Sequence, residues 1–311
     1  MKLKFDKTYP SGQPDPFIFE NNGKFYLYNT CYEGMEAYSS DSLIGPWHRE
    51  GVVCSREGYC NYWAPCIIQT GGKYYVYFSC QPAGDSGLLP MQCLCAAEGD
   101  SPLGPFTGVK QLYNEFSIDA HVVQTEAGLF LFYAKDDTNG TRIGTRVFVD
   151  RLLDPYTPEG KAVEVIAPTM DEEIFRRNRL GDGRDWHTIE GAFWFREGDW
   201  QYVMYSGACY ENDTYHIGYA ASNSREADLT KVKFTKHTAD GRFDPVMIKN
   251  GFEEGVGHHS VIRYNGEYYA IYHGRDLVPD PSLKGDRRTA RICKLHVKDG
   301  IITAERYEDK L

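Results

Sequence analysis

Four ionisable residues in this chain stand where acid/base or metal chemistry could take place. Asp15, Asp119, Glu190 and His258 each come at the start of a short apolar run. A carboxylate there is costly to bury unless it is paired or needed for chemistry. Singly, each has an ordinary explanation: Asp15 before Pro16 is a common turn pairing, and the other acids could cap strands. Together they suggest a site, because converging carboxylates usually bind metal or transfer protons.

Two carboxylates that face each other across a pocket can hydrolyse a glycosidic bond, one as general base and the other as general acid. A third acid nearby raises the pKa of the proton donor by like-charge repulsion. Aromatic side chains would stack on the sugar, and Trp63 is the best candidate, although a tryptophan is as often a core residue.

Five β-hairpins are predicted to position these residues. Each consists of an apolar strand, a tight turn that contains glycine and a second strand rich in aromatic residues. The turn glycines are residues 23, 72, 128, 198 and 266. Eight residues before these glycines stand Asp15, Ala64, Ala120, Glu190 and His258, with Asp119 one residue out of register.

Repeats of this length, with about four short strands each, are typical of propeller blades. We therefore predict an all-β fold, a five-bladed β-propeller that forms a single domain over residues 1–311. The first strand of each blade lines the central channel of a propeller, so the four ionisable residues should meet at one end of it. The third and fourth repeats are longer, and we expect the insertion at residues 165–187 to lie on the pocket rim.

Composition narrows the class of partner. The formal net charge is −10 and the sequence pI is about 5.4, which disfavours nucleic acid and anionic membranes and favours a neutral substrate. The N-terminus has no apolar signal region and no stretch is long enough to span a membrane, so we expect a cytoplasmic protein. The nine cysteines lack the C-x-x-C spacing of zinc sites and are expected to be free thiols.

In combination, the motifs resemble glycoside hydrolase family 43 over nearly the whole chain. The resemblance implies a five-bladed propeller that hydrolyses arabinosides, xylosides and related glycosides with inversion. It implies that Asp15 is the general base, Glu190 the general acid, and Asp119 the residue that modulates the pKa of Glu190. The motifs, in chain order, are Asp15-Pro16, Trp63-Ala64-Pro65, Ile118-Asp119-Ala120-His121, Thr188-Ile189-Glu190-Gly191 and Gly257-His258-His259-Ser260.

The same resemblance implies two further contacts and one departure. Family members often hold calcium or another small ion in the channel, near a histidine that matches His258; no organic cofactor is expected. Arg288 matches an arginine that reaches the substrate hydroxyls. Cys66 replaces the polar or acidic residue that usually follows the Trp-Ala-Pro motif, which leaves the sugar open.

We expect an inverting exo-acting α-L-arabinofuranosidase that acts on short, neutral plant-derived oligosaccharides. Two alternatives in the same family are a β-xylosidase and an endo-arabinanase, and pocket depth separates exo from endo action. Two alternatives outside enzymes are a non-catalytic carbohydrate-binding propeller and a propeller whose acids bind a structural metal. The sequence leaves the oligomeric state, the sugar and its linkage open.

Overall fold

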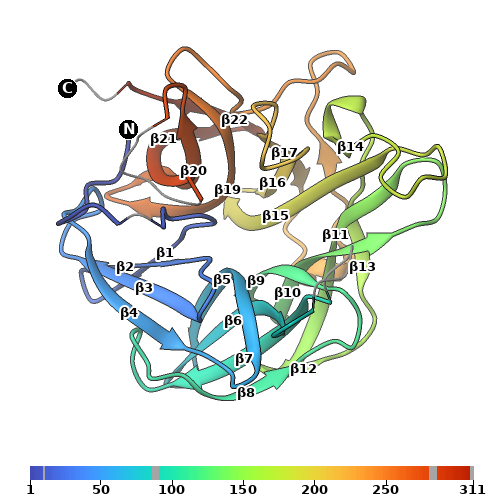
Figure 1. The fold of residues 1–311 in the computed structure, drawn as a ribbon. Coiled ribbons are helices and arrows are strands. Elements are labelled where there is room, and N and C mark those ends of the chain that lie inside the picture. Colours follow the sequence, from blue (N-terminus) through green and yellow to red (C-terminus); the bar gives the residue numbers. More distant parts are fainter. Residues whose placement is uncertain (10, 86–90, 280–285, 309–311) are drawn as a thin grey trace.

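In the computed structural model, which describes residues 1–9, 11–85, 91–279 and 286–308, the chain consists almost entirely of β-strands. The strands form five antiparallel blades that follow one another in chain order around a centre (Figure 1). The predicted all-β, five-bladed propeller is confirmed.

Blades one, two and five are separate four-stranded sheets in which each strand pairs with the next along the chain. Tight turns join the first two strands of each, such as the Asn22-Gly23 turn, in which both residues have positive φ. The strands of these blades are β1 (Phe17–Asn21), β2 (Lys24–Asn29), β3 (Met35–Ser40) and β4 (His48–Cys54); β5 (Tyr59–Thr70), β6 (Lys73–Pro82), β7 (Cys93–Gly99) and β8 (Thr107–Gln111); and β19 (Glu253–Tyr264), β20 (Glu267–Asp276), β21 (Thr289–Lys298) and β22 (Ile301–Glu305).

Blades three and four are fused into one ten-stranded sheet. The fusion is a short parallel pairing in which Ile143 to Thr145 lie beside Trp186 to Thr188. The elements are β9 (Ile118–Thr125), β10 (Gly128–Asp137), β11 (Ile143–Asp154), β12 (Thr157–Pro158) and β13 (Val163–Ile166) in blade three; β14 (Ile174–Arg176), β15 (Trp186–Glu197), β16 (Trp200–Gly207), β17 (His216–Asn223) and β18 (Thr235–Lys236) in blade four; and the 3₁₀ helices η1 (Asp171–Glu173) and η2 (Leu229–Lys231).

Five hydrophobic clusters fill the spaces between neighbouring blades, and the fifth closes the ring. In that cluster Leu27 and Tyr38 of blade one pack against Ile271 and Ile292 of blade five. The N-terminal segment spans the same junction, since the Leu3 backbone N–H donates to the Ala290 carbonyl at 2.9 Å. Burial of apolar surface at each junction therefore holds the blades in a ring and fixes how their inner strands converge.

One residue near the start of each inner strand adopts a left-handed backbone. These residues lie eight positions before the second residue of each hairpin turn: Asp15 (φ 55°), Ala64 (42°), Asp119 (60°), Gly191 (60°) and His258 (46°). The strand pairing is irregular just beside these residues in blades two to five. Such bulges redirect a side chain and are frequent next to active sites.

The left-handed positions correct the predicted register. Asp119, not Ala120, is equivalent to Asp15, and Glu190 stands one position before its blade's equivalent residue, Gly191. The glycine count misled because Gly128 follows its turn and Gly198 is the first residue of its turn, whereas the other three turn glycines come second. Blade four therefore presents its acid from the residue before the bulge.

Two other predictions can be compared with the structure. All nine cysteines are free. No helix among the described residues is long and apolar enough to cross a membrane.

Candidate active site

A pocket of about 120 Å³ opens at one end of the channel, and all six predicted site residues line it. Five of them come one from each blade, and the sixth, Arg288, immediately precedes β21. The lining residues are Asp15, Thr30, Trp63, Ile118, Asp119, Glu190, Tyr210, His258 and Arg288.

Asp15 lies on a cationic side of the pocket. Arg288 Nη1 donates to its Oδ1 at 3.0 Å, and the Thr30 hydroxyl donates to its Oδ2 at 2.6 Å. Nδ1 of His258 lies 3.4 Å from the same Oδ1 and Nδ1 of His273 lies 3.1 Å from it. Burial alone would raise the pKa of Asp15, but the Arg288 guanidinium and a hydrogen bond from His273 outweigh it and hold that pKa well below its usual range. Asp15 is therefore an ionised carboxylate.

Glu190 and Asp119 lie on the opposite, anionic side. Burial raises the pKa of Glu190 to about 7, against the effect of the Tyr215 hydroxyl, which donates to Oε1 at 2.6 Å. Burial and the neighbouring Glu190 charge raise the pKa of Asp119 well above its usual range, although the Gly191 backbone N–H donates to Oδ2 at 3.0 Å. Since two close buried carboxylates resist double ionisation, the pair holds a proton near neutral pH.

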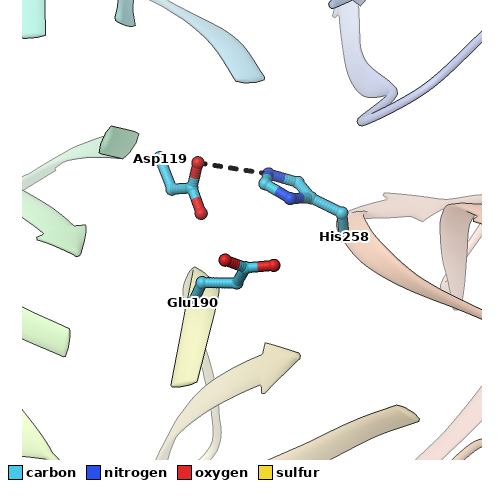
Figure 2. A group of neighbouring side chains, drawn as sticks. All are labelled: Asp119, Glu190 and His258. Atoms are coloured by element: carbon cyan, nitrogen blue, oxygen red, sulfur yellow. Dashed lines mark ion pairs between the residues drawn. The ribbon is translucent and has the colours of Figure 1, made fainter. Parts of the chain in front are cut away.

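His258 lies between the two sides. Figure 2 shows its ring directed at Asp119, with Nε2 4.0 Å from Oδ1, and Glu190 extending toward both residues from β15. Burial lowers the pKa of His258, so its ring is neutral. The neutral imidazole separates Asp15 from Asp119 without adding a charge.

Asp119, Glu190 and His258 do not fit a calcium site. One potential ligand atom from each lies within 4.8 Å of the others, which gives two carboxylate oxygens and one nitrogen. Calcium prefers six to eight oxygen ligands, and a cation between Asp119 and Glu190 would favour the loss of their proton. The predicted channel ion stays a prediction.

Comparison with known proteins identifies the family. The family model for glycosyl hydrolases family 43 matches residues 8–302. The chain belongs to this family. A crystal structure of a thermostable family-43 glycoside hydrolase is 25% identical, with a TM-score of 0.77 over 98% of this chain and 97% of that chain.

Two curated relatives carry names that specify an activity. Alpha-L-arabinofuranosidase B of Pyricularia oryzae is 24% identical over 94% of this chain, but the chain spans only 61% of its length. Probable arabinan endo-1,5-alpha-L-arabinosidase C of Aspergillus clavatus is 33% identical, over 84% of this chain and 82% of its own.

Arg288 lines this family-43 pocket, and its predicted contact with the substrate hydroxyls stays a prediction. Its guanidinium is occupied by Asp15 and by Asp286, to which Nε donates at 3.0 and 2.9 Å and Nη2 at 2.5 Å. It also lies over the Tyr210 ring, 4.5 Å from the centroid. Its main contacts are therefore with Asp15, Asp286 and Tyr210.

Cys66 and the insertion lie elsewhere. Cys66 is buried in the hydrophobic cluster between blades two and three, so it is not a pocket residue. The insertion at residues 165–187 contributes none of the nine residues that line the family-43 pocket, and its predicted place on the rim stays a prediction. It lines a separate cavity of about 350 Å³ with Asn212 and Thr214.

Several site residues were missed by sequence reasoning. Thr30, Tyr210, Tyr215, His273 and Asp286 all touch the predicted residues, but none stands at the start of an inner strand. His273 and Asp286 lie in two late segments that also resemble the family, Tyr272-His273-Gly274-Arg275 and Asp286 to Ile292, but nothing in their spacing linked either residue to Asp15.

Proposed function

We propose that this protein is an inverting, exo-acting α-L-arabinofuranosidase that hydrolyses short neutral oligosaccharides. The observation that carries the proposal is the division of one small pocket into a side that keeps Asp15 ionised and a side that keeps a proton on the Asp119–Glu190 pair. General base and general acid catalysis need these two states together near neutral pH.

In this mechanism Asp15 takes a proton from a water molecule as the water oxygen attacks the anomeric carbon. The bond from that carbon to the leaving oxygen breaks, and Glu190 gives its proton to this oxygen. Asp119 raises the proton affinity of Glu190 and, through the Gly191 N–H, fixes the backbone beside it. Direct attack by water gives the inverted anomer.

Pocket size supports exo action. The 120 Å³ pocket is smaller than the roughly 300–1,000 Å³ that larger ligands occupy, and it suits one sugar ring with Trp63 available to stack on it. Arabinose is proposed because the two curated relatives are named as an arabinofuranosidase and an arabinan arabinosidase.

An endo-arabinanase is the second candidate, because the more identical of these relatives carries that name. A β-xylosidase remains the third. The predicted cytoplasmic location stays a prediction.

The proposal is tested by hydrolysis of aryl α-L-arabinofuranoside, β-D-xylopyranoside and β-D-galactopyranoside, followed by linear arabinan oligomers. We expect turnover of the arabinofuranoside and release of single sugars as the inverted anomer, detected by NMR. Release of longer products would support the endo-enzyme, and turnover of another glycoside would change the sugar. A folded protein that hydrolyses none of them would overturn the proposal in favour of a binding propeller.

Glu190→Ala tests the role of the acid in the same assay. We expect turnover to fall by about 10²–10⁴-fold for poor leaving groups and far less for activated aryl glycosides, because only the former need protonation. Equal losses for both would show that Glu190 is not the proton donor.

A further inference from the structure

Tyr215 lies behind the pocket and contacts the proposed acid. Its side chain is completely buried, and its hydroxyl donates to Glu190 Oε1 at 2.6 Å. A hydroxyl that donates to Oε1 leaves the carboxyl proton of Glu190 to Oε2. Tyr215 therefore determines which oxygen of Glu190 carries the proton.

Gly257 makes room for Tyr215. A Cβ added to Gly257 would lie 2.0 Å from the Tyr215 ring. Gly257 stands one position before His258, the place that Trp63, Ile118 and Glu190 occupy in blades two, three and four. Blade five thus omits a side chain where three other blades supply pocket residues, and a tyrosine from blade four fills the space.

His273 connects Tyr215 to the proposed base. The two rings are nearly parallel, with an interplanar angle of 8° and centroids 5.7 Å apart. His273 Nδ1 lies 3.2 Å from the Asp15 backbone nitrogen and 3.1 Å from Oδ1. A neutral imidazole makes one of these hydrogen bonds at a time, and each ties the ring to Asp15.

We propose that Tyr215 and His273 are positioning residues that join the acid Glu190 to the base Asp15 through a buried stack. The stack fixes the separation of the two carboxyl groups, on which the inverting outcome depends. Tyr215 also stabilises the carboxylate that Glu190 becomes once it has given up its proton. This inference rests on the proposed function.

Several other groups besides Tyr215 also shift the pKa of Glu190, so a titration of Glu190 measures their combined effect. Tyr215 is the hydroxyl that favours the ionised form by hydrogen bonding, and its removal should raise the pKa of Glu190. The charged and titratable groups that face Glu190 are Asp119 on β9, Asp136 on β10, Asp15 before β1, Cys209 after β16, His258 on β19 and Arg288 before β21.

Tyr215→Phe keeps the ring and removes the hydroxyl. We expect turnover to fall about ten- to a hundredfold on poor leaving groups, the range of a hydrogen bond to a charged group, and little on activated ones. The alkaline limb of the pH–rate profile should move up by about one pH unit, because the acid is active when protonated. His273→Phe keeps a stacked ring but loses the contact with Asp15, so both kinds of substrate should slow.

Tyr219→Phe is the matched control, because Tyr219 is a buried tyrosine of the same blade that packs on Tyr202 and His237. Tyr219→Phe should leave unchanged both the ratio of turnover on poor and activated leaving groups and the alkaline limb of the pH–rate profile. Equal losses in Tyr215→Phe on both substrates, with an unmoved limb, would reduce Tyr215 to a structural role while wild-type turnover still supports the proposed function.

A measurement without substrate separates the two proposals. Carboxyl NMR of Glu190 should show a higher pKa in Tyr215→Phe than in the wild type, whether or not any glycoside is hydrolysed. An unchanged pKa would overturn the inference by itself.

Discussion

Asp15 and Asp119 are the same residue type at the same place in two blades, yet they are in opposite protonation environments. Both adopt the left-handed backbone, with φ of 55° and 60°, and both are buried. The pKa of Asp15 is held well below its usual range, and that of Asp119 is raised well above it. The repeat therefore sets where a carboxylate points but does not set its charge.

The difference comes from what faces each aspartate. Arg288 and Thr30 donate hydrogen bonds to Asp15, and two histidines lie beside it. Asp119 receives one backbone N–H, from Gly191, and faces the Glu190 carboxyl. None of the donors to Asp15 lies on an inner strand, so residues outside the repeat pattern turn one of two equivalent acids into a base.

Replacing each aspartate by alanine should change turnover more than any other substitution proposed below. We expect Asp15→Ala to lower turnover by about 10²–10⁴-fold on both activated and poor leaving groups, since every turnover needs the water activated. Asp119→Ala should lower turnover mainly on poor leaving groups, because it acts through Glu190. Hydrolysis rates on paired substrates measure this, and matching patterns for the two variants would contradict the division of roles.

Arg288→Met should move Asp15 toward the state of Asp119. Without the guanidinium the pKa of Asp15 rises, so the acidic limb of the kcat/KM profile should shift up by about one to three pH units. Activity at pH 5 should then fall more than activity at pH 8.

The adjacent, exposed Arg287 supplies the control, and Arg287→Met should leave the limb in place. A loss in Arg288→Met that is uniform across pH would mean that Arg288 acts on the substrate, as first predicted, and not through Asp15.

Hairpin periodicity was enough to predict the propeller and to place five of the six predicted residues in one pocket. Turn pairs and alternating apolar residues are local signals, and five equal blades fix where their inner strands meet. The fusion of blades three and four was not predictable, because the parallel pairing of Ile143 with Trp186 joins segments that carry no shared pattern.

Most of the residues that set the pKa values of the pocket acids could not be predicted from the sequence. Thr30 and Tyr215 contact acids of their own blades and His273 contacts an acid of another blade, and the positions of all three within each repeat look like ordinary strand or loop positions. Arg288 was found only by resemblance, and its pairing with Asp286 was not predicted. The left-handed backbone at Asp119 likewise came from the structure, because glycine was the wrong marker for two turns.

The smallest expected effect is on the free energy of unfolding. Its sign should differ between a variant on the anionic side of the pocket and one on the cationic side. Glu190 binds its proton more tightly in the folded state, with a pKa near 7 against 4.5, so its contribution to stability is lost as pH rises between these values. Glu190→Gln should therefore be more stable than the wild type by about 1–3 kcal/mol at pH 8 and nearly equal to it at pH 4.

Asp15→Asn should be less stable than the wild type at pH 8. The lowered pKa of Asp15 stabilises the fold above pH 3.8, and the substitution also leaves Arg288 without this carboxylate partner. Urea unfolding at both pH values tests the pair, and a shift of the same sign in both variants would show that the two sides are not electrostatically distinct.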